Sequence, residues 1–194
     1  ILFEYHPTRA GSVPTEFLNG YEGVVQTDGY KAYNFIDDAE GMDHMACWAH
    51  VRRKFKDVVK AGGQSKKAKQ KTGNANRALK FIQKLTNIEK KAKEAGIVGD
   101  ALLKERQEKA KPILDSFEIW LDEKAKTTPP TSLLGQAITY ALNQWERLVV
   151  YADTHHVPMD NNLAENAIRP FALGRKNWLF SATPEGAAAS AAIY

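Results

Sequence analysis

The fold class of this chain is decided by one stretch, Gly23-Val24-Val25-Gln26-Thr27-Asp28. β-branched residues favour strands, and this run stops at a charged residue followed by Gly29, which is typical of a strand that ends in a turn. Short strand and helix patterns alternate around it, so we predict an α/β fold. The expected neighbours are a strand over residues 1–6, short helices over residues 14–18 and 30–35, and an extended segment over residues 43–47.

After Cys47 the apolar residues recur at helical spacing. Trp48, Val51 and Phe55 share one face of a predicted helix that ends at Gly62-Gly63. Similar patterns predict three more helices before Tyr151, with a kink at Pro112, a break at residues 127–130 and an N-cap at Ser132. We predict that residues 48–152 form a mostly helical insertion. Residues 1–47 and 153–194 are too small to be separate folds, so together they are expected to form the α/β part.

The C-terminal part contains two further helix signals. Asp160 is a good N-cap for a helix over residues 161–169, which Pro170 is expected to end. Thr183-Pro184-Glu185 has a cap, a first-turn proline and a first-turn acid, so a final helix is expected after it. The sequence opens on Ile1-Leu2-Phe3 without Met and ends in an Ala-rich pattern at Tyr194, so we expect a piece of a longer protein.

Composition excludes several classes of protein. The chain has 194 residues, 43% hydrophobic and 26% charged, which is ordinary for a globular protein and unlike a disordered one. It lacks a membrane-length apolar stretch and a signal-peptide pattern, so we expect a cytoplasmic protein without a membrane partner. The single cysteine, Cys47, excludes an internal disulfide.

Two carboxylates are candidates for metal chemistry. Asp28 is predicted at the carboxyl end of a strand, where ligands bind in open α/β sheets. Glu165 lies on the polar side of its predicted helix, one turn before Arg169. Rigid carboxylates of this kind suit hard divalent ions, and two such ions can cleave phosphodiesters. The alternatives are a plain Asp-Gly turn and a solvated Glu–Arg surface pair.

Other residues suggest weaker sites. Cys47 and His50 have C-x-x-H spacing, and His44, His155 or His156 could complete a zinc site, although a packed thiol beside a helical histidine is the more ordinary interpretation. The cations Arg52, Arg53, Lys54 and Lys56 and the run over residues 66–71 could contact DNA phosphates or form a solvated face. Arg175, Lys176 and Trp178 interleave cations with an aromatic ring, as DNA-binding segments do.

Four blocks of sequence together resemble the catalytic region of bacterial transposases of the insertion sequence 66 family. They run from Val25 to Asn34, from Cys47 to Phe55, from Asp160 to Pro170 and from Gly174 to Phe180. The resemblance implies a ribonuclease-H-like domain with an Asp, Asp, Glu triad and a helical insertion before the Glu. Asp28 matches the second Asp and Glu165 the Glu, while the first Asp belongs to a strand with no counterpart in this chain.

The same resemblance implies a function. The parent protein is expected to cleave and join DNA at transposon ends with two Mg²⁺ or Mn²⁺ ions, as a homo-oligomer. Asp28 and Glu165 would bind the ions, and Arg169, Arg175 and Lys176 would hold backbone phosphates. Without the first Asp, this chain alone is expected to be inactive. The alternatives are a non-enzymatic DNA-binding or assembly module and a nuclease of the same fold.

Overall fold

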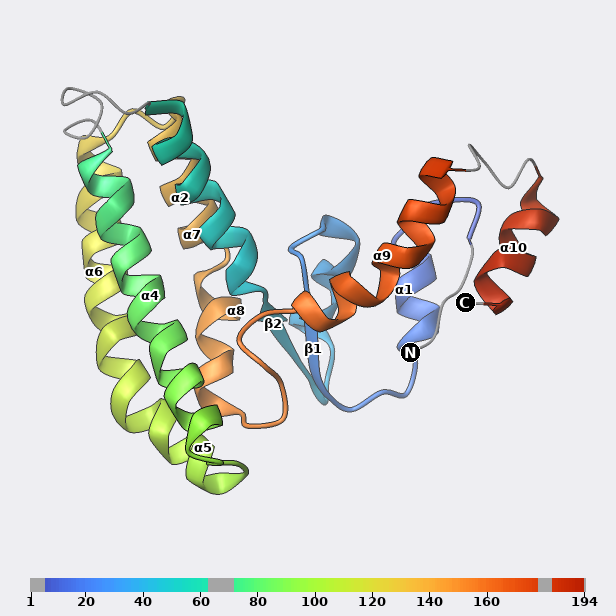
Figure 1. The fold of residues 1–194 in the computed structure, drawn as a ribbon, viewed down its shortest axis with the longest axis horizontal. Coiled ribbons are helices and arrows are strands. Elements are labelled where there is room, and N and C mark those ends of the chain that lie inside the picture. Colours follow the sequence, from blue (N-terminus) through green and yellow to red (C-terminus); the bar gives the residue numbers. More distant parts are fainter. Residues whose placement is uncertain (1–5, 63–71, 178–182, 194) are drawn as a thin grey trace.

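A computed structural model describes residues 6–62, 72–177 and 183–193 of the chain (Figure 1). Its first elements are α1 (Ser12–Phe17), β1 (Gly23–Thr27), the 3₁₀ helix η1 (Lys31–Asp38) and β2 (Met42–Ala46). β1 and β2 are parallel, with Gly23 opposite Met42 and Thr27 opposite Ala46. This unit matches the α/β pattern expected around residues 23–28. The strand expected over residues 1–6 is not found at His6, and residues 1–5 lie outside the described ranges.

The middle of the chain forms a helical bundle. Its helices lie side by side (Figure 1), and they are α2 (Trp48–Gly62), α4 (Gly73–Glu94), α5 (Asp100–Glu105), the π-helical segment η2 (Arg106–Ala110), α6 (Lys111–Thr127), α7 (Leu133–Asn143), α8 (Trp145–Val149) and the 3₁₀ helix η3 (Val150–Asp153). The interruption expected at Pro112 takes the form of η2, which ends just before that residue. Ser132 caps α7 as predicted, accepting a 3.0 Å hydrogen bond from the amide of Gly135. The Lys-rich run over residues 66–71 lies outside the described ranges.

Aromatic side chains fill the core of the bundle. Trp48 stacks against Phe117 and meets Trp145 and Tyr151 edge to face, with ring centroids 6.1–6.3 Å apart. The indole nitrogen of Trp48 donates a 3.0 Å hydrogen bond to the carbonyl oxygen of Leu148. Such rings bury large apolar areas and have preferred contact geometries, so they fix α2 against α6 and α8.

The chain returns from the bundle to the sheet through residues 154–161. The amide of Trp48 donates to the carbonyl of Met159, and the side-chain amide of Gln26 donates to the carbonyl of Pro158 at 3.0 Å. Met159 is buried, so this segment is anchored in the core by an apolar side chain. These contacts bring the start of α9 (Asn162–Asn177) beside β1 and the first turn of α2.

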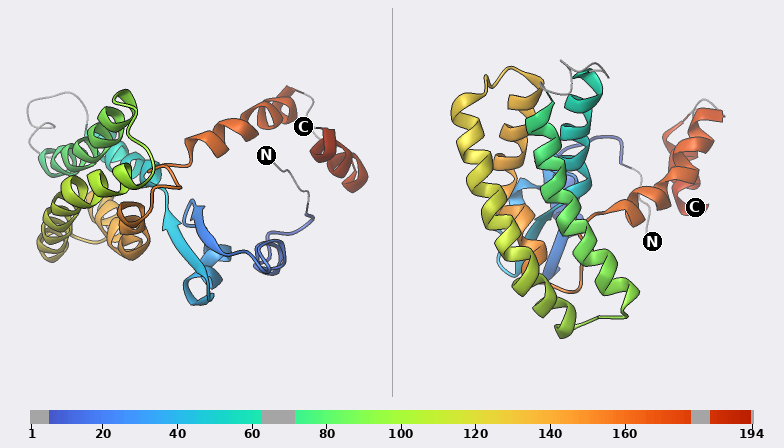
Figure 2. Two further views of the ribbon diagram at one scale, coloured as in Figure 1. Left: turned by 90° about the horizontal axis from the view of Figure 1, so that it is seen from below. Right: turned by 60° about the vertical axis from the view of Figure 1, so that its left-hand side comes forward.

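Beyond that point α9 and α10 (Pro184–Ile193) extend away from the bundle (Figure 2). The prediction that Pro170 ends the helix is wrong, because α9 continues through it to Asn177. Proline removes one backbone donor, but a helix can pass it by bending, and α9 bends part-way along (Figure 1). Leu163 on α9 is 79% exposed and Ala164 is also exposed, so these two apolar residues at the start of the helix do not pack into the core. None of the described helices is both long and apolar enough to cross a membrane.

Candidate functional site

A cavity of about 800 Å³ is lined by β1, α1 and the first residues of α2 and α9. Asp28 follows the end of β1, and Glu165 lies in the first turn of α9. Both line this cavity, together with His50 and Asn161. The structure thus brings to one site two carboxylates that are far apart in the sequence.

A tight turn holds Asp28 at the end of β1. The Oδ1 atom of Asp28 accepts a 2.9 Å hydrogen bond from the amide of Tyr30, and Gly29 between them has a φ of +82°. A residue with a Cβ atom is strained in this left-handed conformation. From α7, the hydroxyl of Tyr140 donates a hydrogen bond to the carbonyl oxygen of Asp28. The turn is therefore fixed from within and from the helical bundle.

Behind this turn lies a polar network around the buried side chains of Thr27 and His44. The imidazole of His44 on β2 has its Nε2 atom 2.8 Å from the hydroxyl of Thr27 and its Nδ1 atom 2.7 Å from Asp37. Asp37 also accepts hydrogen bonds from the guanidinium of Arg147 on α8. The contact with Asp37 favours a charged imidazole, but burial outweighs it, and Arg147 already neutralises that carboxylate. The pKa of His44 therefore lies below its ordinary value.

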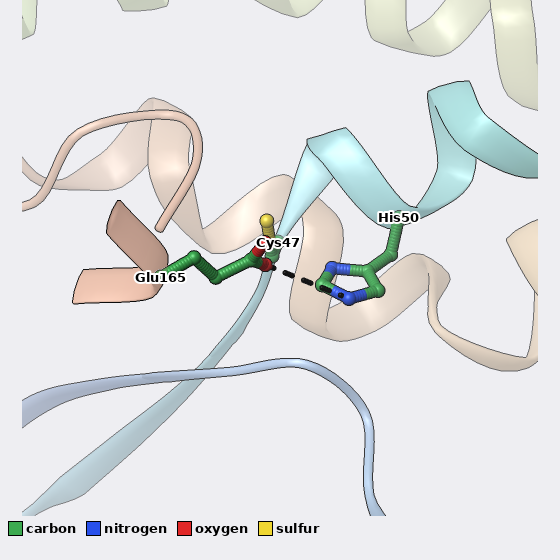
Figure 3. A group of neighbouring side chains, drawn as sticks. All are labelled: Cys47, His50 and Glu165. Carbon is green, nitrogen blue, oxygen red and sulfur yellow. Dashed lines mark ion pairs between the residues drawn. The ribbon is translucent and has the colours of Figure 1, made fainter. Parts of the chain in front are cut away.

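The start of α9 is fixed by its own polar residues. The carboxylate of Asp160 accepts a 3.1 Å hydrogen bond from the amide of Asn162, the first residue of α9. The helix begins one residue later than predicted, so Asp160 lies just before the N-cap position and not at it. Glu165 then points toward α2, where its Oε1 atom lies 3.7 Å from His50 Nε2 (Figure 3). Its Oε2 atom lies 3.7 Å from a guanidinium nitrogen of Arg53. Glu165 is therefore not the plain solvated partner of Arg169.

Cys47 lies beside the same carboxylate. Its buried sulfur accepts a 3.4 Å hydrogen bond from the amide of Asn161. Burial raises the pKa of the Cys47 thiol, so the free side chain is neutral. The histidines considered as its metal partners lie elsewhere: His44 contacts Asp37, and His155 lies 3.9 Å from Asp100. The C-x-x-H spacing of Cys47 and His50 is visible in the sequence, but no local pattern indicates that Glu165 is their neighbour.

Several buried polar atoms at this site lack a hydrogen-bond partner. Among the described residues, such atoms include His50 Nδ1, Asn161 Oδ1 and Glu165 Oε1. Buried polar groups are normally paired, so three unpaired atoms on one cavity indicate capacity for a ligand. Carboxylate and amide oxygens are the donors that Mg²⁺ and Mn²⁺ take. Asp28, Asn161 and Glu165 offer oxygen atoms of this kind on the lining of one cavity.

Comparison with known proteins identifies the family of this chain. A profile of the Transposase IS66 family matches residues 1–189. The chain belongs to this family. Its relatives in Sinorhizobium fredii (strain NBRC 101917 / NGR234) include uncharacterized protein y4hP, 33% identical over 92% of this chain, and uncharacterized protein y4qI, 30% identical over 96%. Each match covers 34% of the relative, so the chain spans about a third of the length of these proteins. No solved structure matches it.

The basic residues that we consider for DNA contact in this IS66-family chain lie on two helices, α2 and α9. On α2, the cations Arg52, Arg53, Lys54 and Lys56 are exposed. Arg53 contacts Glu165, and the ammonium of Lys54 lies 5.4 Å from the ring centre of Tyr140. On α9, Arg169 is exposed, while the side chains of Arg175 and Lys176 and all of Trp178 lie outside the described part of the structure.

Proposed function

We propose that this chain is part of the catalytic domain of a DNA transposase with a ribonuclease-H-like fold, in which Asp28 and Glu165 bind divalent metal ions. One observation carries the proposal: a strand-end carboxylate and a helix carboxylate line the same cavity although the whole helical bundle separates them in sequence. Membership in the IS66 transposase family supports the reaction class.

The ions would be a pair of Mg²⁺ or Mn²⁺. Bound metals of this kind lower the pKa of water and neutralise charge on a phosphate undergoing in-line displacement. The protein's own part is to position them. The Asp28 turn is held by the amide of Tyr30 and the hydroxyl of Tyr140, and Glu165 is held between His50 and Arg53. Rigid support of this kind keeps metal ligands in a productive geometry.

DNA would approach along the exposed cations. We assign the exposed residues Arg52, Lys54 and Lys56 on α2 and Arg169 on α9 to one DNA-contacting surface, together with Arg175 and Lys176. Such residues would contact backbone phosphates, which position DNA without reading its sequence. We assign residues 48–152 to a helical insertion in the catalytic domain, which supports the Asp28 turn through Tyr140. A homo-oligomeric active complex is part of the proposal.

The two alternative functions are a DNA-binding assembly module and a nuclease of the same fold, and they make different demands on Asp28 and Glu165. An assembly module that only binds DNA has no need for Asp28 and Glu165 on one cavity, so their placement favours an enzyme. A nuclease of the same fold would use the same carboxylates. It would differ by cutting DNA without preference for transposon ends and without joining the product to a target.

The test uses the full-length parent protein with duplexes that carry its transposon end, and with random duplexes. We expect Mg²⁺-dependent cleavage at the end sequence followed by joining to target DNA, and loss of both in Asp28→Asn and Glu165→Gln. Matched controls are Asp122→Asn and Glu123→Gln, which remove exposed acids on α6 and should leave activity unchanged. Cleavage that survives both site variants would overturn the assignment, and equal cutting of random DNA would favour the nuclease.

The chain of 194 residues is expected to be inactive in the same assay. By the family resemblance, a third carboxylate is needed and belongs to another segment of the parent. Cleavage by the isolated chain that is abolished by Asp28→Asn would show that two carboxylates suffice.

A further inference from the structure

We propose that Cys47, His50 and Glu165 form a binding site for a transition-metal ion of the Zn²⁺ class, with one coordination position open to the cavity. This site is distinct in chemistry from a pair of Mg²⁺ ions, because it offers sulfur and nitrogen as well as oxygen. It shares Glu165 with the proposed catalytic site. A Zn²⁺ ion held there would take this carboxylate away from Mg²⁺.

The distances fit one small ion. One donor atom from each of the three residues lies within 4.8 Å of the other two, and His50 Nε2 lies 3.7 Å from Glu165 Oε1 (Figure 3). Ligand atoms around a tetrahedral Zn²⁺, at bond lengths of about 2.0–2.3 Å, are separated by roughly 3.3–3.8 Å. Small side-chain rotations are enough to bring these atoms to bonding distance.

The three ligands are held by rigid elements. Cys47 lies between β2 and α2, and its amide donates a 3.1 Å hydrogen bond to the carbonyl of Thr27. His50 follows in the first turn of α2, and Glu165 lies in the first turn of α9. The hydrogen bond from the Asn161 amide to the Cys47 sulfur joins the two helix starts. The geometry of the site therefore depends on the fold and not on a mobile loop.

The site has unused coordinating capacity. Glu165 Oε1 is buried without a hydrogen bond, and its contact with His50 is too long to be one. The other imidazole nitrogen, His50 Nδ1, and the amide oxygen Asn161 Oδ1 are also buried and unpaired. An unpaired buried carboxylate oxygen is costly, and a bound cation would remove that cost. Asn161 lines the same cavity, so its Oδ1 atom would accept a hydrogen bond from a water on the ion.

The donor types select the metal. Thiolate and imidazole favour Zn²⁺ and its neighbours over Mg²⁺, which prefers oxygen ligands alone. Binding would replace the thiol proton of Cys47 with the metal and release that proton to solvent, while His50 binds as neutral imidazole. Three protein ligands and an open fourth position are the arrangement of reactive zinc sites and not of closed structural ones. The open position would accept water or a phosphate oxygen.

The experiment is a Co²⁺ titration of the 194-residue chain, followed by displacement with Zn²⁺. Co²⁺ replaces Zn²⁺ in such sites and reports a sulfur ligand through a thiolate charge-transfer absorption. We expect one ion per chain, with this absorption, and its loss on adding one equivalent of Zn²⁺. Cys47→Ser should abolish the absorption, and His50→Ala and Glu165→Gln should each weaken binding at least tenfold. Circular dichroism of every variant checks that the fold is kept.

Two control variants separate this site from its rivals. His156→Ala removes the exposed member of the His155–His156 pair, whose rings lie 3.9 Å apart and could bind metal adventitiously. Asp28→Asn changes the proposed Mg²⁺ site without touching the sulfur site. Both should leave the Co²⁺ spectrum and affinity unchanged. A spectrum without the charge-transfer absorption, or binding that is lost in His156→Ala and kept in Cys47→Ser, would overturn the proposal.

The outcome is independent of the proposed transposase activity. Metal binding is read by spectroscopy on the isolated chain, whereas the proposed function is read by DNA cleavage in the parent protein. A failed titration would leave the cleavage test standing, and a failed cleavage test would leave the Co²⁺ spectrum as evidence for the site.

Discussion

The hydroxyl of Tyr140 on α7 donates a 3.3 Å hydrogen bond to the backbone carbonyl oxygen of Asp28. This contact links the helical bundle to the turn that carries the proposed catalytic carboxylate. Tyr140→Phe removes the hydroxyl alone, so we expect a loss of about 0.5–1.5 kcal/mol in the free energy of unfolding. Urea titration checks this loss. Tyr33→Phe is the matched control, because the described structure shows Tyr33 on the same cavity but shows no hydrogen bond from its hydroxyl to Asp28.

Gly29 supplies the conformation that the same turn requires. Its φ is +82°, and a Cβ atom there would lie 3.2 Å from the Tyr140 hydroxyl and 3.5 Å from the side chain of Gln144. Gly29→Ala therefore combines backbone strain with crowding, and we expect a loss of roughly 1–2 kcal/mol in the free energy of unfolding. Gly73→Ala is the control, since Gly73 begins α4 with open space around its Cα and no positive φ. Equal stability of the two variants would contradict the role given to Gly29.

Local sequence signals were sufficient for part of this structure. β1 and the turn after it follow from residues 23–28, and the caps at Ser132 and Thr183 were predicted from residue type, with Thr183 accepting a 3.1 Å hydrogen bond from the amide of Gly186. Pro170 predicts a helix end, and this prediction is wrong because α9 bends and continues past the proline.

The sequence predicts the individual residues of the candidate site but not that they lie together. Asp28 and Glu165 were each recognisable as carboxylates on rigid elements, but their meeting depends on the path of residues 154–161 back to β1. The contact between Thr27 and His44 depends likewise on the parallel register of β1 and β2. Long-range pairings of this kind leave no periodic signal in the sequence, which explains why Glu165 was not expected beside Cys47.

The buried imidazole of His44 makes stability depend on pH. Burial lowers its pKa in the folded protein below the ordinary value of 6.5, so the unfolded chain binds this proton more tightly. The contribution of neutral, buried His44 to the free energy of unfolding is complete above pH 6.5. It is lost as the pH falls through the lower pKa of His44 in the folded state. We expect the free energy of unfolding to decrease on acidification below about pH 6.5.

The measurement is urea unfolding at a series of pH values for the wild type, His44→Gln and His156→Gln. His44→Gln should be less stable at neutral pH and should lose the pH dependence between pH 6.5 and the folded pKa. His156 is exposed, so His156→Gln should retain it. A second decrease in the free energy of unfolding is expected at lower pH in all three proteins. Burial raises the pKa of Asp37, but the contacts with Arg147 and His44 lower it by more, so protonation of Asp37 destabilises the folded state. An unchanged profile in His44→Gln would assign the pH dependence to other groups.

Arg106 fixes the segment that leads to α9. Its side chain is almost fully buried, pairs with Glu89 at 2.7 Å and donates to the carbonyl oxygens of Tyr151, Thr154 and Val157. Arg106→Met leaves the Glu89 carboxylate and three carbonyls without this partner, so we expect a loss of about 3–5 kcal/mol in the free energy of unfolding. Adding Glu89→Met should recover part of the loss, because no unpaired charge then remains. Urea unfolding of the single and double variants measures both effects.

The basic face of α2 should make DNA binding sensitive to salt. Arg52 and Lys56 are exposed on this helix, whose buried side carries Val51 and Phe55. If both cations neutralise phosphates, the log–log slope of affinity against salt should decrease by about 0.9 for each one removed. Arg52→Glu combined with Lys56→Glu should therefore weaken binding to every duplex and flatten the slope, because phosphate contacts carry no sequence information. Arg53 is left unchanged because it contacts Glu165.

Lys80→Glu combined with Lys91→Glu makes the same change of charge on α4, at exposed positions that do not line the cavity. This control separates local contact from the net charge of +4, since a purely global effect would weaken both double variants equally. Arg175→Glu combined with Lys176→Glu tests the second proposed group in the same way. The measurement is titration of labelled duplex at several salt concentrations. A slope that changes in the α2 variant and not in the α4 variant assigns the DNA-contacting surface to the side of the bundle that carries Arg53 and the cavity.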